Sequence, residues 1–135
     1  MIIVNLIYID KKTEYNQDFN LESKIVEKIE ADAVVDLNKL VNFNFDKVYV
    51  CKNSVRMIDI LKDKSFAISH KKIADDSNYL IFVSKNNKVV RFTGLDKKYK
   101  ILNSTFKIYS KKDAIFKFDK LRYKDKTVYE LNYFN

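Results

Sequence analysis

The stretch NFNFDKVYVCKNSVRMIDIL, residues 42–61, changes its hydrophobic period halfway along, and this change decides the fold class. Residues 45–51 are rich in β-branched and aromatic side chains and predict a strand, with Val48 and Val50 on one face. Residues 53–61 place apolar side chains three positions apart behind a polar cap, which is the spacing of an amphipathic helix. The chain therefore mixes strand and helix over a short distance.

A second helix is predicted earlier in the chain. Leu21, Ile25 and Ile29 recur every four positions, so they lie on one side of a helix. Asp18 or Asn20 can cap its first turn, because a short polar side chain there accepts a hydrogen bond from a backbone N–H group. The pattern predicts a helix that packs on a sheet through this apolar stripe.

Further strands flank these helices. Residues 2–9 and 79–83 are apolar on both faces, as is typical of central strands. Residues 33–37 predict a short strand, and residues 105–110, TFKIYS, alternate apolar with polar side chains. Asn86-Asn87 tolerates the positive φ angles of a tight turn, so a hairpin is predicted there.

The C-terminal part predicts a second hairpin, in which residues 114–123 and 127–134 are strands joined by a Lys-Asp-Lys turn. In the first strand Phe116 and Phe118 share a face, whereas the apolar residues after them lie on the other face. This change of phase predicts a β-bulge at Asp119-Lys120.

These elements predict the fold class. Short turns between neighbouring strands favour antiparallel pairing, and no linker rich in Gly, Ser or Pro divides the chain. We therefore expect a single α+β domain over residues 1–135, with a mainly antiparallel β-sheet of about six to eight strands and two α-helices packed on it.

The composition bears on the cellular compartment. One cysteine cannot form an internal disulfide, so the fold does not depend on oxidation. The apolar run MIIVNLIYI, residues 1–9, lacks the basic start and the cleavage site of a signal peptide and is too short to span a bilayer. We expect a soluble, cytoplasmic protein with no membrane partner.

Several kinds of chemistry lack the residues they need. A metal site needs clustered ligands, and the chain has one His and one Cys, 19 positions apart. Loops that bind phosphate need glycines, and Gly94 is alone. We predict no metal, no cofactor and no catalytic residue. The alternative is an enzyme, with either a Cys51–His70 nucleophile and base pair or a nuclease site of His70 with residues 71–72. The interpretation that we favour is that Cys51 is a partly buried strand residue and His70 a solvated loop residue.

The charge is concentrated in one part of the sequence. Residues 85–126 carry 14 basic and 4 acidic side chains, a net charge of +10, whereas residues 1–84 carry a net charge of −1. Aromatic residues are interleaved with these lysines. Such strands can bind nucleic acid through phosphate contacts and base stacking. They can also bind an acidic protein. Alternatively, the aromatic side chains form the core, the lysines form the solvated face, and the region has no special role.

We expect an acidic protein partner, because only three of the 26 basic residues are Arg, the side chain better suited to stacked and bidentate contacts with nucleic acid. Nucleic acid remains the alternative partner. The predicted partner-binding residues are the basic side chains of this region: Lys85, Lys88, Arg91, Lys97, Lys98, Lys107, Lys117, Arg122 and Lys124.

Two segments resemble a group of small bacterial proteins. Phe45-Asp46-Lys47-Val48-Tyr49 matches a strand that precedes a helix in those proteins, and NYLIFVSKNNKVV, residues 78–90, is similar to their central hairpin. Some single-domain proteins of this sort are immunity proteins of contact-dependent growth inhibition, which neutralise a toxin. The resemblance covers about 50 to 60 of the 135 residues and implies no catalytic residue.

The resemblance implies a non-enzymatic immunity protein that binds a cognate toxin and occludes its active site. Such a protein needs a rigid surface with a complementary potential, and no reactive group. If the toxin is a basic nuclease, the contact set is instead the acidic residues of the first predicted helix: Glu22, Glu27, Glu30 and Asp32.

Overall fold

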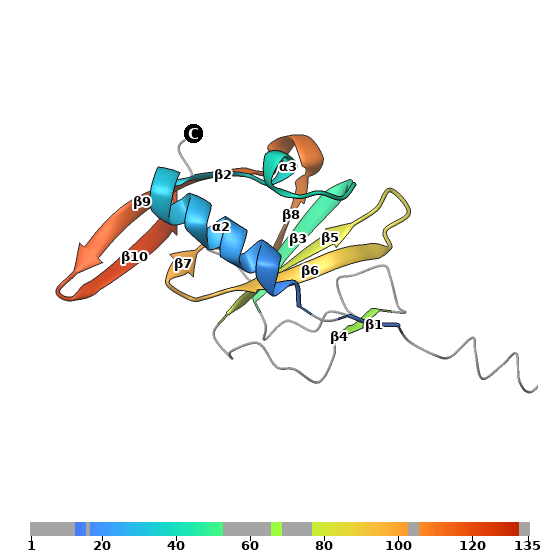
Figure 1. The fold of residues 1–135 in the computed structure, drawn as a ribbon, viewed down its shortest axis with the longest axis horizontal. Helices are drawn as coiled ribbons and strands as arrows, with labels where there is room; N and C mark the ends of the chain where they lie inside the picture. Colours follow the sequence, from blue (N-terminus) through green and yellow to red (C-terminus); the bar gives the residue numbers. More distant parts are fainter. Residues whose placement is uncertain (1–12, 16, 53–65, 69–76, 103–105, 133–135) are drawn as a thin grey trace, which may run out of the picture.

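A computed structural model gives the structure of the chain (Figure 1). The residues it describes are 13–15, 17–52, 66–68, 77–102 and 106–132. The strand predicted at residues 2–9, the helix predicted at 53–61 and His70 lie outside them. The described residues form an α+β fold in which antiparallel pairing dominates.

The first four-stranded sheet, here called the β3 sheet, has the spatial order β6-β5-β3-β8, and all of its pairs are antiparallel. Its central strands are β3, which the sequence predicts as a strand over residues 45–51, and β5, which it predicts as a central strand over residues 79–83. The bounds are β3 (Lys47–Lys52), β5 (Asn78–Val83), β6 (Val89–Leu95) and β8 (Phe106–Ser110).

The second four-stranded sheet, here called the β9 sheet, has the order β2-β9-β10-β7, with β10 and β7 parallel and the other pairs antiparallel. A separate parallel pair joins β1 (Thr13–Tyr15) and β4 (Phe66–Ile68). The bounds in the β9 sheet are β2 (Val34–Asp36), β7 (Tyr99–Lys100), β9 (Ile115–Tyr123) and β10 (Lys126–Leu131).

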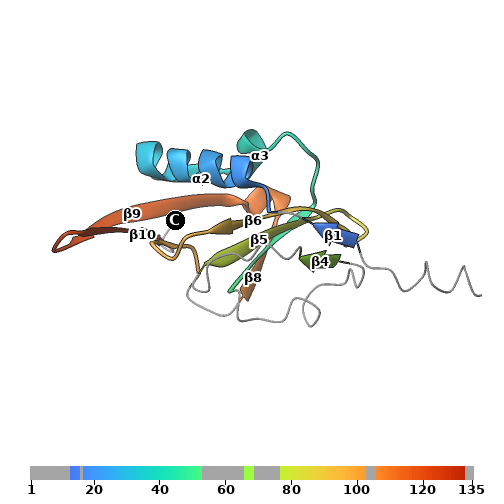
Figure 2. The ribbon, with the colours of Figure 1, turned by 60° about the horizontal axis from the view of Figure 1, so that its bottom comes forward.

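The strands are thus divided between sheets, whereas the sequence predicts one. The chain passes between the sheets more than once, since β2 and β7 of the β9 sheet precede β8, and after β8 the 3-10 turn η1 (Lys111–Asp113) leads into β9 (Figure 2). A hydrophobic pattern predicts which side chains are buried, but it does not say which strands share a ladder. The partition therefore follows from tertiary pairing.

Two helices lie among the described residues, α2 (Phe19–Asp32) and the short α3 (Leu37–Leu40). The predicted cap is confirmed, because the carboxylate of Asp18 accepts a hydrogen bond from the N–H group of Leu21 at 3.0 Å. Helix α2 packs against β6 and β2 (Figure 1). Neither of these helices is long and apolar enough to cross a membrane.

The β3 strand separates two hydrophobic clusters. Val48 and Val50 belong to the larger cluster, which also takes side chains from α2 and from the β9 sheet. Tyr49 and Cys51 belong to a smaller cluster on the opposite face. The predicted face of Val48 and Val50 is confirmed, and the four middle residues of the strand, 48–51, are buried on both faces, as is typical of a central strand.

The predicted bulge at Asp119-Lys120 is wrong. The β9–β10 ladder runs without interruption from Phe118, opposite Leu131, to Tyr123, opposite Lys126. Phe118 is buried and Tyr123 is exposed, because the hairpin leaves the core and projects from the body of the molecule (Figure 1). The change of phase in the sequence therefore marks the end of the core and involves no extra residue.

Both hairpin turns use a left-handed residue. Asn87, at φ 60°, lies in the loop between β5 and β6, as the sequence predicts for this Asn pair. Lys124, at φ 54°, begins the two-residue turn between β9 and β10. A chain with one glycine places other residue types in this conformation, and that costs about 1 kcal/mol per position.

Candidate functional site

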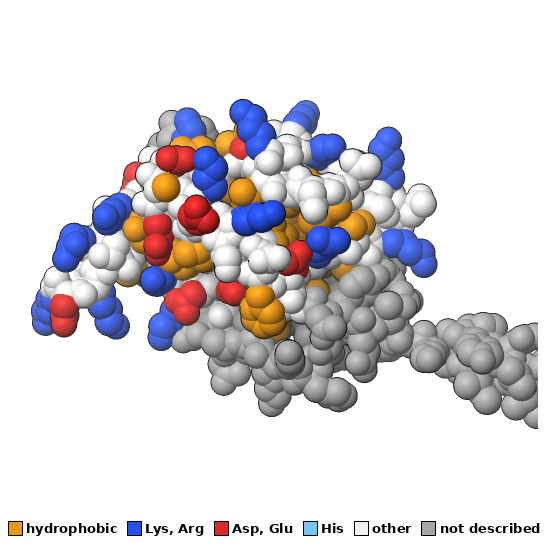
Figure 3. Space-filling model, in the orientation of Figure 1, with side chains coloured by type: hydrophobic (Ala, Val, Ile, Leu, Met, Phe, Trp, Pro, Cys, Tyr) orange, Lys and Arg blue, Asp and Glu red, His pale blue; other side chains and the backbone are white. Residues whose placement is uncertain are grey.

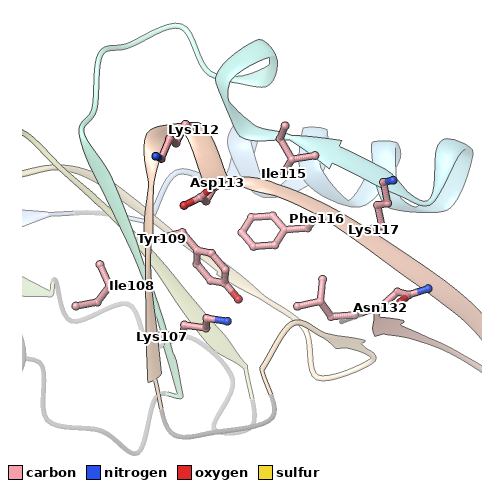
Figure 4. Close-up of a pocket in the computed structure, with 10 residues that line it drawn as sticks. Lys107, Ile108, Tyr109, Lys112, Asp113, Ile115, Phe116, Lys117 and Asn132 are labelled. Carbon is pink, nitrogen blue, oxygen red and sulfur yellow. The ribbon is translucent and has the colours of Figure 1, made fainter. Parts of the chain in front are cut away.

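A groove of about 490 Å³ lies between β8 and β9, where the two sheets diverge (Figure 4). It combines aromatic side chains with lysines. Its lining residues are Lys107, Ile108, Tyr109, Lys112, Asp113, Ile115, Phe116, Lys117, Leu131 and Asn132.

Two rings meet inside the groove. Tyr109 from β8 and Phe116 from β9 turn toward each other, with their centroids 4.8 Å apart and their planes nearly perpendicular (Figure 4). The Lys107 ammonium lies 5.1 Å from the centroid of the Tyr109 ring, which attracts a cation through its electron-rich face. The groove therefore presents a positive charge beside an aromatic surface.

The alternation of β8 explains this arrangement. Successive side chains of a strand point to opposite faces, so Lys107 and Tyr109 face the groove while Ile108 extends to the other side (Figure 4). The sequence pattern suggests that Phe106 and Ile108 are the inward residues of this strand, but they are 39% and 43% exposed. The reason is that β8 is the last strand of its sheet.

Exposed apolar side chains concentrate near this groove. Ile115 of β9 lines it and is 48% exposed, and Phe106 and Ile108 are exposed on the other face of β8, the strand that borders it. Large apolar side chains that share a surface patch are more informative than single ones, because such patches mark interaction sites. The sequence gives no signal for them, since a buried strand and an edge strand show the same alternation.

The charge at the rim is mainly positive. Lys112 and Lys117 add to Lys107, and Asp113 is the acidic residue of the lining. The Asp113 carboxylate accepts a hydrogen bond from the Ser110 hydroxyl at 2.9 Å, which holds it in the turn. The groove therefore favours an anionic ligand.

The predicted partner-binding residues do not form one site. Lys107 and Lys117 line the groove. Lys85 and Lys88 lie at the exposed turn that joins β5 to β6, the edge strand opposite β8 in the β3 sheet. The others lie at the β6–β7 turn (Lys97 and Lys98), at the tip of the β9–β10 hairpin (Arg122 and Lys124) and on β6 (Arg91).

Arg91 has partners within the chain. Its guanidinium lies 3.2 Å from the carboxylate of Asp18 and 4.6 Å from the centroid of the Phe43 ring. These contacts hold the start of α2 on β6. Arg91 is therefore engaged inside the fold.

A second basic cavity, of about 590 Å³, lies beside the β9–β10 hairpin. Lys98 there is 3.7 Å from the Glu30 carboxylate, which also accepts a hydrogen bond from the Tyr99 hydroxyl. Burial and this carboxylate raise the pKa of Tyr99. The lining residues are Lys97, Lys98, Lys100, Lys126, Thr127 and Val128.

The acidic alternative falls on α2, where acidic side chains gather (Figure 3). Asp32 pairs with Lys28 at 2.8 Å, and Glu30 contacts Lys98 and Tyr99. Burial and the nearby Asp96 raise the pKa of Glu22. Most of this acidic set is thus neutralised or half-buried, and Glu27 is its exposed member outside these contacts.

The nucleophile of the enzymatic alternative is inaccessible. Cys51 is fully buried in the smaller cluster, and burial raises the pKa of its thiol to about 12. A thiol in that state supplies almost no thiolate, which is the reactive form. Within the described ranges, no three His, Cys, Asp or Glu residues are placed to hold a metal ion.

Comparison of the chain with protein-family models, with curated proteins and with solved structures finds no match.

Proposed function

We propose that the chain is a non-enzymatic protein-binding domain that receives an acidic partner in the β8–β9 groove. The observation that carries the proposal is that the exposed Ile115 and the rings of Tyr109 and Phe116 line one groove together with lysines such as Lys107. Apolar side chains supply the buried centre of a protein interface, and charges at the rim speed association and select the partner.

The most concrete form of the proposal is an immunity protein, as the resemblance of residues 45–49 and 78–90 implies. Such a protein neutralises a cognate toxin by covering its active site. It needs no chemistry of its own, which agrees with a buried Cys51. An acidic surface on the toxin would complement the net charge of +8 on this chain.

Growth rescue tests the proposal. The protein encoded beside this chain is expressed alone and together with it, and binding of the two purified proteins is measured by calorimetry. We expect growth arrest by the neighbour, relief by this chain, and a complex that persists at physiological salt. Arrest that this chain does not relieve, together with no measurable complex, contradicts the proposal.

The projecting β9–β10 hairpin favours a second candidate, a nucleic-acid-binding module. Its tip carries Arg122, Lys124 and Lys126, and Tyr123 beside them is 56% exposed. The major groove of DNA admits a two-stranded β-ribbon, and an exposed tyrosine can stack on an unpaired base. The other three lysines of the neighbouring cavity, Lys97, Lys98 and Lys100, would add phosphate contacts.

Salt dependence separates the two candidates. Neutralising about four phosphates predicts an affinity loss of roughly 100-fold between about 50 and 200 mM salt. Fluorescence anisotropy with labelled duplex and single-stranded oligonucleotides measures this loss. Binding that is abolished by Arg122→Glu with Lys124→Glu and retained by Lys85→Glu with Lys88→Glu would support the nucleic-acid candidate.

A further inference from the structure

We infer that the acidic partner binds as an added β-strand, in which an extended segment of alternating acidic and apolar residues pairs with the outer edge of β8. The inference rests on the proposed function and specifies how the partner is recognised. Strand addition uses main-chain hydrogen bonds for affinity and alternate side chains for specificity.

The hydrogen-bond phase of the β3 sheet shows which groups of β8 point outward. The N–H group of Lys111 donates to the C=O group of Asp46 at 2.9 Å, in the same register as the β3–β8 ladder. Hydrogen-bonded pairs alternate along an antiparallel ladder, so Lys107 and Tyr109 direct their main-chain groups to β3. The main-chain groups of Ile108 therefore point to the outer edge.

The opposite edge of the same sheet confirms this phase. The same alternation of hydrogen-bonded and non-hydrogen-bonded pairs, followed from β3 through β5 to β6, places the C=O group of Phe92 on the outer edge of β6. That carbonyl accepts a hydrogen bond from the N–H group of Asp18 at 3.0 Å. The β6 edge is thus partly occupied by the start of α2, whereas no described strand pairs with the outer edge of β8.

The other sheet edges are poorer templates. Among the described residues, β2 has three residues and β7 has two, whereas β8 has five. A longer edge offers more main-chain hydrogen bonds to an incoming strand. The groove of about 490 Å³ lies directly beside it and provides room for side chains.

The two faces of β8 define the sequence of the partner. One face carries Lys107 and Tyr109 and opens into the groove, and the other carries the exposed Phe106 and Ile108. Cross-strand neighbours on one face interact directly. An added strand therefore places acidic side chains toward Lys107 and apolar side chains toward Ile108, in strict alternation.

Lys107 also explains the choice of an acidic occupant. A lysine on an edge strand disfavours pairing with an apolar strand, because its charge would lose solvent without compensation. A carboxylate opposite the ammonium removes this penalty. The Lys107 side chain therefore both disfavours an apolar strand and favours an acidic one.

A peptide in which Glu and Val alternate tests the inference, with amide hydrogen exchange of Ile108 as the readout. We expect the peptide to slow exchange at Ile108, and a peptide with Lys in place of Glu to have no effect. N-methylation of alternate peptide amides should weaken binding by about tenfold or more, since it removes main-chain donors. In an added strand only one of the two sets of alternate amides faces β8, so protection of Ile108 that survives N-methylation of each set in turn contradicts strand addition.

Two charge reversals give the matched comparison. Lys107→Glu should weaken peptide binding by about tenfold, whereas Lys88→Glu, the same change in the β5–β6 turn, should leave it within about twofold. Lys107→Gln, a milder change, guards against misfolding. Equal losses in Lys107→Glu and Lys88→Glu, or no exchange protection at millimolar peptide, overturn the inference.

The outcomes separate the inference from the proposed function. If the toxin that this chain neutralises binds the Lys107→Glu variant as tightly as the unmodified chain, the proposed function stands and strand addition fails. If the peptide binds as expected but no toxin is neutralised, the function fails and the edge site stands. A dimer in sedimentation that Lys107→Glu dissociates would identify a second copy as the occupant and overturn the acidic partner.

Discussion

Ala33, which ends α2, has a conformation that favours glycine. Its φ of 58° and ψ of 16° are left-handed, and its N–H group donates to the C=O group of Ile29. We expect Ala33→Gly to raise the free energy of unfolding by about 0.5–1 kcal/mol, because it removes a steric cost that exceeds the added entropy of the unfolded chain. Ala31→Gly, inside the helix, should lower it by about 1 kcal/mol.

Urea denaturation of the two glycine variants measures this difference. Opposite signs for two alanines of one helix cannot come from a general effect of glycine. A lower midpoint for Ala33→Gly than for the unmodified chain would contradict the role assigned to the left-handed conformation.

Cys51 tests the burial of the β3 strand. Burial raises the pKa of its thiol to about 12, whereas an unfolded cysteine titrates near about 8.5. Its contribution to stability is therefore complete below about pH 8.5 and is lost as the pH rises toward about 12. We expect iodoacetamide to leave the folded chain unmodified at about pH 8 and to alkylate it in urea.

Mass spectrometry follows this alkylation over time. The unfolded chain is the control, since it shows that the reagent is active. Rapid modification of the native chain would mean that Cys51 is accessible, and it would reopen the enzymatic alternative.

At the scale of elements, the start of α2 depends on Asp18. Its side chain caps the helix at Leu21 and pairs with Arg91. Asp18→Ala removes both interactions and should lower the free energy of unfolding by about 1–2 kcal/mol. Asp18→Asn keeps the cap and loses only a partly exposed ion pair, so it should cost less than about 1 kcal/mol.

Thermal unfolding of the two Asp18 variants measures these costs. Arg91→Lys serves as a further control, because it keeps a charge near Asp18 but loses the planar contact with Phe43. Equal destabilisation by Asp18→Ala and Asp18→Asn would show that the ion pair, and not the cap, holds the helix.

The sequence predicts the elements whose signal is local. The stripe of Leu21, Ile25 and Ile29 becomes the buried side of α2, and alternate residues of β3 divide between two clusters, as the two-residue period requires. The β-bulge predicted at Asp119-Lys120 is absent from the β9–β10 ladder. Polar residues where a core face should continue are found both at a bulge and in a strand that projects into solvent, so the sequence pattern does not distinguish the two.

The candidate site is less predictable for a related reason. Charge alone selects Lys107 and Lys117 together with Arg91, although Arg91 is engaged with Asp18. The exposed Phe106 and Ile108 are missed, because their exposure depends on β8 being an edge strand. Strand order is a long-range property, and no window of a single sequence contains it.

At the scale of the whole molecule, charge and structure are organised differently. The basic residues are contiguous in the sequence but are distributed in space over the groove, two turns and a hairpin. The acidic side chains of α2 lie between some of these regions (Figure 3). Each basic region therefore acts locally, because exposed charges more than about 10 Å apart are largely screened at physiological salt.

The larger hydrophobic cluster joins α2, the β3 sheet and the β9 sheet, and it predicts cooperative unfolding. Leu80 lies on β5 and Leu131 lies on β10, and both belong to this cluster. If the two sheets share one core, Leu80→Ala and Leu131→Ala should each shift one common transition by about 2–5 kcal/mol. Circular dichroism and tyrosine fluorescence should report the same midpoint.

The denaturant dependence of unfolding makes this last prediction decisive. A single cooperative unit exposes the same surface in every variant, so both substitutions should lower the urea midpoint and leave the slope unchanged. Separate sheets would give two transitions, with Leu80→Ala shifting one and Leu131→Ala the other. A shared core predicts the first result, because removing apolar volume on either side weakens the packing of both sheets at once.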